Sequence, residues 1–228
     1  DNEIAPPAKG WANHATVMGY YLHRIKNERT LYRGQEIRGG THSFLRVKLW
    51  HVVASDRNHE LTYRVTPEDF SPAEYPLRVS LDLTYRIEGT GISIAFKFKS
   101  DEPELPAHVG FGLHPGFAAT SFDSFHFEMP AGLYRRHFSP ENYLSGETED
   151  IQFVGGEMPF ARDSLPGSYI LDLVDVPTRT FTFIDHPRGR TVVLHPPRVP
   201  SPTLLSVARS LRVRRPRRGP PASPAPQP

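Results

Sequence analysis

The sequence contains no cysteine among its 228 residues. Disulfides, thiolate zinc sites and cysteine nucleophiles are therefore excluded, and stability must come from packing. It also contains no apolar run that approaches the roughly 18 residues needed to cross a bilayer, so no transmembrane helix is expected. We expect no membrane partner and a cytoplasmic location.

Acidic residues are missing from the C-terminal part of the chain. Residues 1–194 hold all 25 Asp and Glu and 20 of the 27 Lys and Arg, a net charge of −5, whereas residues 195–228 carry +7 and 10 of the 24 prolines. We therefore expect one domain over residues 1–195 and a basic Pro/Arg-rich tail over residues 196–228, too poor in apolar residues to order, except that Leu204–Leu211 could form two helical turns. Because the domain itself is not basic, a nucleic-acid partner is not expected.

The clearest periodicity in the chain is alternation. From Val79 to Ile87 every odd residue is apolar and every even residue is polar, the pattern of a strand with one buried face. The alternation resumes over residues 92–99 after Glu88-Gly89-Thr90-Gly91. A short glycine-containing connection of this kind predicts an antiparallel hairpin.

Further short β-rich runs are separated by Pro, Gly, Asp and Asn. They are residues 49–54, 61–65, 122–129, 178–184 and 191–194, with a small hairpin over residues 30–37 that turns at Arg33-Gly34. No amphipathic helix of ten or more residues is evident in residues 1–194. The sequence predicts an all-β fold, an antiparallel β-sandwich.

Eleven histidines in a cysteine-free chain raise the question of a metal. Zinc and iron sites usually combine ligands at short local spacing, and no H-x-H or H-x-x-x-H occurs here. We therefore expect no metal.

The most specific stretch is Gly110-Phe111-Gly112-Leu113-His114-Pro115-Gly116-Phe117. Glycines at 112 and 116 leave space beside the ring of His114, which suits a side chain that reaches a ligand. On these residues alone, a histidine that is satisfied by a backbone carbonyl is an equally good interpretation.

This stretch resembles the G-x-G-x-H-P-x-F motif of the aldose 1-epimerase family, the galactose mutarotases. Residues 18–27 are similar to the family's early N-R-I segment, and Gly39-Gly40-Thr41-His42-Ser43-Phe44-Leu45-Arg46 with Trp50 is similar to its H-G-F-x-R…W segment. Tyr75-Pro76-Leu77 and the paired strands follow in the family's order.

The resemblance implies a galactose mutarotase-like supersandwich, which we expect to be incomplete at both ends because the chain begins at Asp1 rather than Met and lacks closing strands. It implies acid–base opening of a hexose ring at the anomeric carbon, with interconversion of α and β anomers and no cofactor. His114 would be the catalytic acid, and Arg24, His42 and Asp172 would bind sugar hydroxyls; Asp175 competes with Asp172.

The chain also departs from the family pattern. The family's base is a Glu near the C-terminus, but the last carboxylate here is Asp185. His23 replaces an Asn before Arg24, Ser43 replaces a Gly and Gly116 replaces a common aromatic residue. Glu147, Glu149 and Glu157, interpreted as solvated loop acids, give no sign of substituting for the base.

These departures keep three functions open. The first is an aldose 1-epimerase. The second is a sugar-binding homologue without turnover, and the third is a hexose-6-phosphate 1-epimerase, for which Arg46 or Arg135-Arg136 could bind the phosphate. A nucleic-acid role for the tail comes last.

Overall fold

The computed structural model describes residues 16–56, 58–101, 107–116, 125–158, 168–196 and 204–208. They divide into two compact units, an N-terminal unit within Asn13–Pro115 and a C-terminal unit within Gly116–Pro228. Each unit is described by itself. In the described ranges the helical elements are 3-10 turns of three residues: η1 (Lys26–Glu28), η2 (Leu45–Val47), η3 (Pro67–Asp69), η4 (Pro140–Asn142) and η5 (His186–Arg188).

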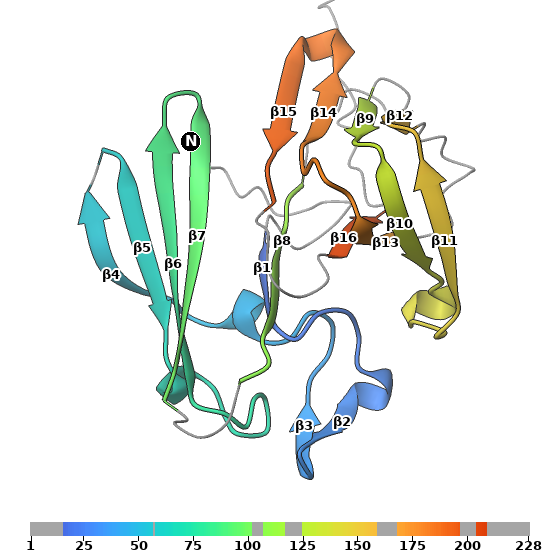
Figure 1. Ribbon diagram of the computed structural model, residues 1–228. Helices are drawn as coiled ribbons and strands as arrows, with labels where there is room; N and C mark the ends of the chain where they lie inside the picture. Colours follow the sequence, from blue (N-terminus) through green and yellow to red (C-terminus); the bar gives the residue numbers. More distant parts are fainter. Residues whose placement is uncertain are drawn as a thin grey trace, which may run out of the picture. The chain divides into compact units, whose positions relative to one another are not determined.

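The largest sheet of the N-terminal unit has the order β4-β5-β6-β7 (Figure 1). Its strands are β4 (His51–Asp56), β5 (Glu60–Val65), β6 (Val79–Glu88) and β7 (Gly91–Ser100). The antiparallel β6–β7 ladder runs from Val79 opposite Ser100 to Glu88 opposite Gly91, around Gly89 at φ 59°. The hairpin predicted from alternation is confirmed.

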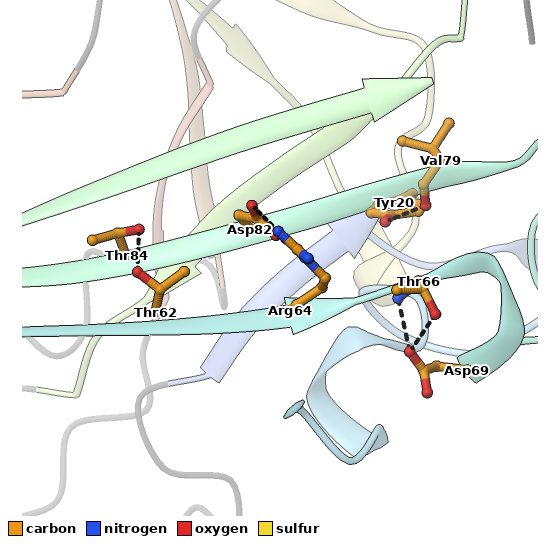
Figure 2. Close-up of polar contacts among 8 residues, drawn as sticks. All are labelled: Tyr20, Thr62, Arg64, Thr66, Asp69, Val79, Asp82 and Thr84. Carbon is orange, nitrogen blue, oxygen red and sulfur yellow. Dashed lines mark hydrogen bonds and ion pairs between the residues drawn. The ribbon is translucent and has the colours of Figure 1, made fainter. Parts of the chain in front are cut away.

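The two faces of this sheet follow the alternation of β6. Val79, Leu81 and Leu83 are buried, whereas Asp82 and Thr84 lie on the opposite face. Figure 2 shows Asp82 in a bidentate pair with Arg64, at 2.6 and 2.8 Å, and the hydroxyl of Thr84 2.9 Å from that of Thr62. Exposed ion pairs add about 0–1 kcal/mol, so the buried face supplies most of the stability.

Tyr20 lies at the centre of the N-terminal core. Its side chain is 1% exposed, and its hydroxyl donates to the carbonyl of Val79 at 2.9 Å (Figure 2). Four aromatic rings meet it edge-on at centroid distances of 4.9–5.9 Å: Phe44, Phe70, Tyr75 and Phe98. One residue of β1 thus joins the large sheet to the loops that follow β3 and β5.

Two shorter ladders complete the N-terminal unit. β1 (Thr16–Tyr20) pairs antiparallel with β8 (Gly110–His114), and β2 (Arg29–Tyr32) pairs with β3 (Gln35–Arg38). Arg33 and Gly34 have φ values of 50° and 81°, as a tight hairpin turn with two left-handed residues requires. The predicted turn at Arg33-Gly34 is confirmed.

The turn η3 carries a capping box. Asp69 accepts hydrogen bonds from the backbone N–H of Thr66 at 2.7 Å and from its hydroxyl at 3.0 Å (Figure 2). Burial alone would raise the pKa of Asp69, but these bonds and one to His51 lower it overall. The ionised carboxylate therefore stabilises the fold above the unfolded pKa of about 3.9, and this contribution is lost as pH falls through the lower folded value.

Replacing Asp69 with alanine is expected to reduce the free energy of unfolding by about 0.5–2 kcal/mol, since a capping residue is lost. Urea titration at pH 7 measures the change. Glu147→Ala removes an exposed carboxylate and serves as the control, with an expected change within about 0.5 kcal/mol. Equal stability of the two variants would refute the capping role.

The C-terminal unit contains two antiparallel four-stranded sheets. One has the order β11 (Thr148–Phe153), β10 (Gly132–His137), β13 (Ser168–Asp175), β16 (Leu204–Ala208). The other has the order β12 (Gly156–Met158), β9 (Phe125–Met129), β14 (Phe181–Asp185), β15 (Arg190–Leu194).

Both sheets of the C-terminal unit contribute to one core. Phe127, Met129 and Phe181 come from the second sheet, and Tyr134, Leu171 and Leu173 come from the first, with Val176 just after β13. Two sheets that share a core make this unit a β-sandwich. All pairings of named strands among the described residues are antiparallel, so the predicted all-β fold class is confirmed.

One local prediction is wrong. The sequence allowed two helical turns over Leu204–Leu211, but Leu204–Ala208 is strand β16, paired antiparallel with Ser168–Asp172. The edge of β13 offers a row of backbone donors and acceptors, and pairing with them satisfies more backbone groups than two isolated helical turns would. Residues 197–203 and 209–228 of the expected disordered tail lie outside the described part of the chain. No helix among the described residues is long and apolar enough to span a membrane.

Candidate functional site

His114 is the last residue of β8, opposite Thr16 on β1. Because residues alternate along a strand, His114 shares a face with Gly110 and Gly112. A side chain on Gly112 would begin 3.2 Å from Cε of Met18, its terminal methyl carbon, so the glycine lets β8 lie close to β1. The spacing of the motif therefore sets an imidazole beside two residues without side chains.

The His114 ring is half-buried. Burial lowers its pKa below the ordinary 6.5, and a hydrogen bond with its own backbone acts in the opposite direction. His114 therefore makes the backbone hydrogen bond that was one of the two interpretations of the sequence motif. The ring is also 5.6 Å, centroid to centroid, from the ring of His42, in an edge-on arrangement.

The loop that carries His42 is hydrogen-bonded to β1. The N–H of Tyr20 donates to the buried hydroxyl oxygen of Ser43 at 3.0 Å, and the N–H of Gly19 donates to the carbonyl of His42 at 3.4 Å. Ser43, which replaces the family's glycine, has a φ of 62°. The left-handed backbone that the glycine would favour is kept, and the hydroxyl supplies a bond that a glycine cannot make.

His23 and Arg24 approach the same loop from the segment after β1. Arg24 forms an isolated antiparallel bridge with Thr41, and the N–H of His42 donates to the carbonyl of His23 at 2.7 Å. The rings of His23 and His42 are 6.2 Å apart. The N-terminal unit therefore brings together Arg24, His42 and His114, which the sequence predicted as site residues. His23 lies beside them.

The electrostatics of this cluster favour a neutral His42. Burial is the largest cause, and the positive charges of His114, His23, Arg46 and Arg24 add to it, so the pKa of His42 falls from 6.5 to about 4. At neutral pH the neutral ring of His42 therefore lies beside the permanent charges of two guanidinium groups. Such groups can bind oxygens and exchange a proton with them.

Arg46 is half-buried on η2. Its Nε has no hydrogen-bond partner within the described part of the chain and is buried from solvent. The turn itself is held by Trp50, whose indole N–H donates to the carbonyl of Leu45 at 3.1 Å. Trp50, part of the sequence motif, thus has a structural role in placing the turn that carries Arg46.

Asp172 belongs to the C-terminal unit. It lies on β13, where its Oδ2 is 2.8 Å from His137 Nε2, and both side chains are about one-fifth exposed. Asp175, at the end of the same strand, is exposed. A half-buried carboxylate with a fixed imidazole partner is better ordered for binding a hydroxyl than an exposed one.

The acids considered as substitutes for the base also lie in the C-terminal unit. Glu149 is on β11, 3.7 Å from Arg136, and Glu157 is on β12 against His126, so these two are strand residues rather than the loop acids expected from sequence. Arg135 is paired with Asp150 at 2.7 Å. Both members of the Arg135-Arg136 pair considered for a phosphate already contact carboxylates.

The described residues contain no group of three His, Asp or Glu side chains that could hold a metal ion. Sequence reasoning recorded His23 only as a departure from a pattern and Arg46 only as an unspecific cation. The structure places both beside His42. No signal in a single sequence could have done so, because residues 23 and 42 are joined through backbone bonds across a loop.

Comparison with known proteins points to one family. The family model described as aldose 1-epimerase matches residues 5–195. No curated protein sequence matches the chain.

Two solved structures are similar in fold. A galactose mutarotase-like protein from Lactobacillus casei has a TM-score of 0.69 at 20% identity, with 81% of this chain and 65% of that one covered. A galactose mutarotase related enzyme from Lactobacillus acidophilus has a TM-score of 0.65 at 18% identity, with coverages of 78% and 61%. The chain thus spans less than two thirds of either structure's length, and its fold is the galactose mutarotase-like one predicted from the sequence.

Proposed function

The chain belongs to the aldose 1-epimerase family, and from this premise we propose that it interconverts the α and β anomers of a hexose. The observation that carries the proposal is the contact between the His42 and His114 rings, 5.6 Å apart beside Arg24. A proton-exchanging imidazole next to fixed hydrogen-bond donors is what opening of a sugar ring needs.

In the proposed reaction a base removes the proton from the C1 hydroxyl while an acid protonates the ring oxygen. The C1–ring oxygen bond breaks, C1 rotates about the bond to C2, and the reverse steps close the ring on the other face of the aldehyde. His114 is assigned as the acid. A buried imidazole with a lowered pKa holds its proton weakly, so it transfers the proton readily to the ring oxygen.

Arg24 and His42 are proposed to bind sugar hydroxyls. Arg24 is exposed and its guanidinium presents five N–H donors. Asp172, which belongs to the C-terminal unit, stays a separate proposal for binding a hydroxyl through its acceptor oxygens, of which Oδ2 lies 2.8 Å from His137 Nε2.

A second candidate is sugar binding without turnover. It is favoured by the absence of any Asp or Glu after Asp185, and by the state of Asp185, which is buried and accepts from Arg190 at 3.2 Å. If no other carboxylate acts as the base, the chain still binds the sugar, but the mutarotation rate is lower by a factor of about 10²–10⁴.

A phosphorylated hexose is the alternative substrate. Arg46, with its buried Nε near His42, is the cation to which a phosphate would be assigned. Comparing a hexose with its 6-phosphate in the binding assay below separates the two substrates.

Replacing Arg24 with alanine is expected to weaken aldose binding roughly ten- to hundred-fold, because hydrogen bonds to a charged donor contribute about 1.5–3 kcal/mol. Isothermal titration calorimetry with glucose and galactose measures the dissociation constant. Arg86→Ala, which removes an exposed guanidinium paired with Glu60, is the matched control and should bind as the unaltered chain does. Equal affinity of the two variants would remove Arg24 from the site.

Polarimetry on freshly dissolved α-anomers separates the two candidate functions. Faster relaxation with the protein than in buffer supports the epimerase. Calorimetric binding with relaxation at the buffer rate supports the binding protein. Absence of both would overturn the proposed function.

A further inference from the structure

His23 and His42 exchange two hydrogen bonds of different kinds. The N–H of His42 donates to the carbonyl of His23 at 2.7 Å, and the N–H of His23 donates to Nδ1 of the His42 ring at 3.3 Å. The bridge between Arg24 and Thr41 lies directly beside this pair. The His42 ring is thus fixed by backbone atoms rather than by another side chain.

The backbone adopts unfavourable angles to make this arrangement. His23 and His42 have φ values of 66° and 60°, in the left-handed region that non-glycine residues seldom adopt. Strained residues of this kind persist where the surroundings hold them, and they cluster at functional sites. Here the strain aims a backbone N–H at a ring nitrogen.

That hydrogen bond decides which ring nitrogen of His42 carries the proton. A nitrogen that accepts from an N–H must present its lone pair, so Nδ1 is unprotonated and the neutral ring carries its hydrogen on Nε2. The groups that face the ring oppose a second proton: His23 and Arg24 from the segment after β1, Arg46 from η2 and His114 from β8.

We propose that the backbone N–H of His23 locks His42 as the neutral Nε2–H tautomer, so that His42 only donates to a ligand and cannot act as a base. His42 then determines specificity for an accepting oxygen, and His114 is the member of the ring pair that exchanges protons. The ligand part of this inference rests on the proposed function, whereas the tautomer does not. His42 is therefore excluded as a replacement for the family's glutamate base.

The tautomer is tested without any ligand, by long-range ¹H–¹⁵N NMR of the ¹⁵N-labelled chain at pH 7. The His42 signals, assigned by their loss in His42→Gln, should show an unprotonated Nδ1 and a protonated Nε2. They should not titrate between pH 8 and pH 5, whereas in urea the same ring should titrate near about 6.5. A protonated Nδ1, or a folded-state midpoint above pH 6, would overturn the lock.

The donor role is tested with a matched pair of variants. His42→Gln retains an N–H donor near the position of Nε2, whereas His42→Asn places its amide near Nδ1 and leaves no donor at Nε2. By calorimetry, His42→Gln should bind aldose within about three-fold of the unaltered chain, and His42→Asn should bind roughly ten-fold more weakly, the loss of one hydrogen bond.

Thermal unfolding of both variants separates a binding effect from a folding effect. Asparagine binding as well as glutamine in folded variants would overturn the donor role. If the unaltered chain binds no aldose while NMR still shows the Nε2–H tautomer, the proposed function fails and the lock stands; if aldose binds and NMR shows Nδ1–H, the lock alone fails.

Discussion

Replacing His114 with alanine is expected to lower the catalysed mutarotation rate by roughly 10²–10⁴, the usual contribution of one positioned acid. The motif around residue 114 places the ring beside glycines and within 5.6 Å of His42, so no neighbouring side chain fills the vacated position without rearrangement. Polarimetry on α-glucose and α-galactose measures the rate above the buffer background.

His59→Ala is the matched control, since it removes an exposed imidazole that lies 3.5 Å from Asp56, at the turn after β4. That variant should retain the full rate. Relaxation in His114→Ala as fast as in the unaltered chain, with both proteins folded, would remove His114 from the mechanism.

The pH profile gives a second readout for His114. Burial lowers its pKa, so the proton-donating form declines as pH rises through a value below 6.5. The acceleration that depends on this acid should therefore fall with rising pH in that range, and the residual rate of His114→Ala should lack the fall. A profile with the same pH dependence in both proteins would contradict the assignment.

Replacing Tyr20 with alanine is expected to reduce the free energy of unfolding by about 3–5 kcal/mol, as for other large-to-alanine changes in cores. The ring is 1% exposed and four aromatic rings surround it, so its removal leaves a cavity that rigid neighbours cannot fill. Because β1 also carries Gly19, which is bonded to the His42 loop, aldose binding should fall with stability.

Two further variants separate the packing of the Tyr20 ring from the hydrogen bond of its hydroxyl and provide a control. Tyr20→Phe keeps the ring and leaves the Val79 carbonyl without its 2.9 Å donor, for an expected cost of about 1–3 kcal/mol. Tyr143→Ala removes an exposed tyrosine, 37% accessible, and should change stability by less than about 0.5 kcal/mol. Urea titration ranks the three. Equal costs for Tyr20→Ala and Tyr143→Ala would show that the core does not depend on Tyr20.

Alternation predicted the β6–β7 hairpin to within one residue at each end of each strand, because β6 has one buried and one solvated face and β7 packs Phe96 and Phe98 against the same core. Three of the strands that sequence reasoning missed show little of that contrast. β11 has its two apolar residues, Ile151 and Phe153, only at its end, β12 has three residues and β10 ends in Arg135, Arg136 and His137. Edge and short strands form where a neighbour offers backbone partners, and no local pattern records the neighbour.

The candidate site was predictable to the same limited degree. Residue types at motif spacing identified His114, His42 and Arg24, and the structure brings these three together in the N-terminal unit. The structure also shows that Trp50 supports η2 and that Arg46 lies beside His42. Motif spacing alone cannot distinguish these two residues from ordinary core or surface residues.

The amino-acid sequence alone predicted the all-β class and the family, excluded cysteine chemistry, and suggested His114 as a candidate acid. These inferences depend on composition, on period-two alternation and on motif order. The tertiary structure was needed to show that Leu204–Ala208 is a strand, that Asp172 has His137 as a partner, and that the His23 backbone donates to His42. The reason is physical: a hydrogen bond between residues 19 or 35 positions apart depends on where the loops and ladders of the fold place them, which local sequence does not encode.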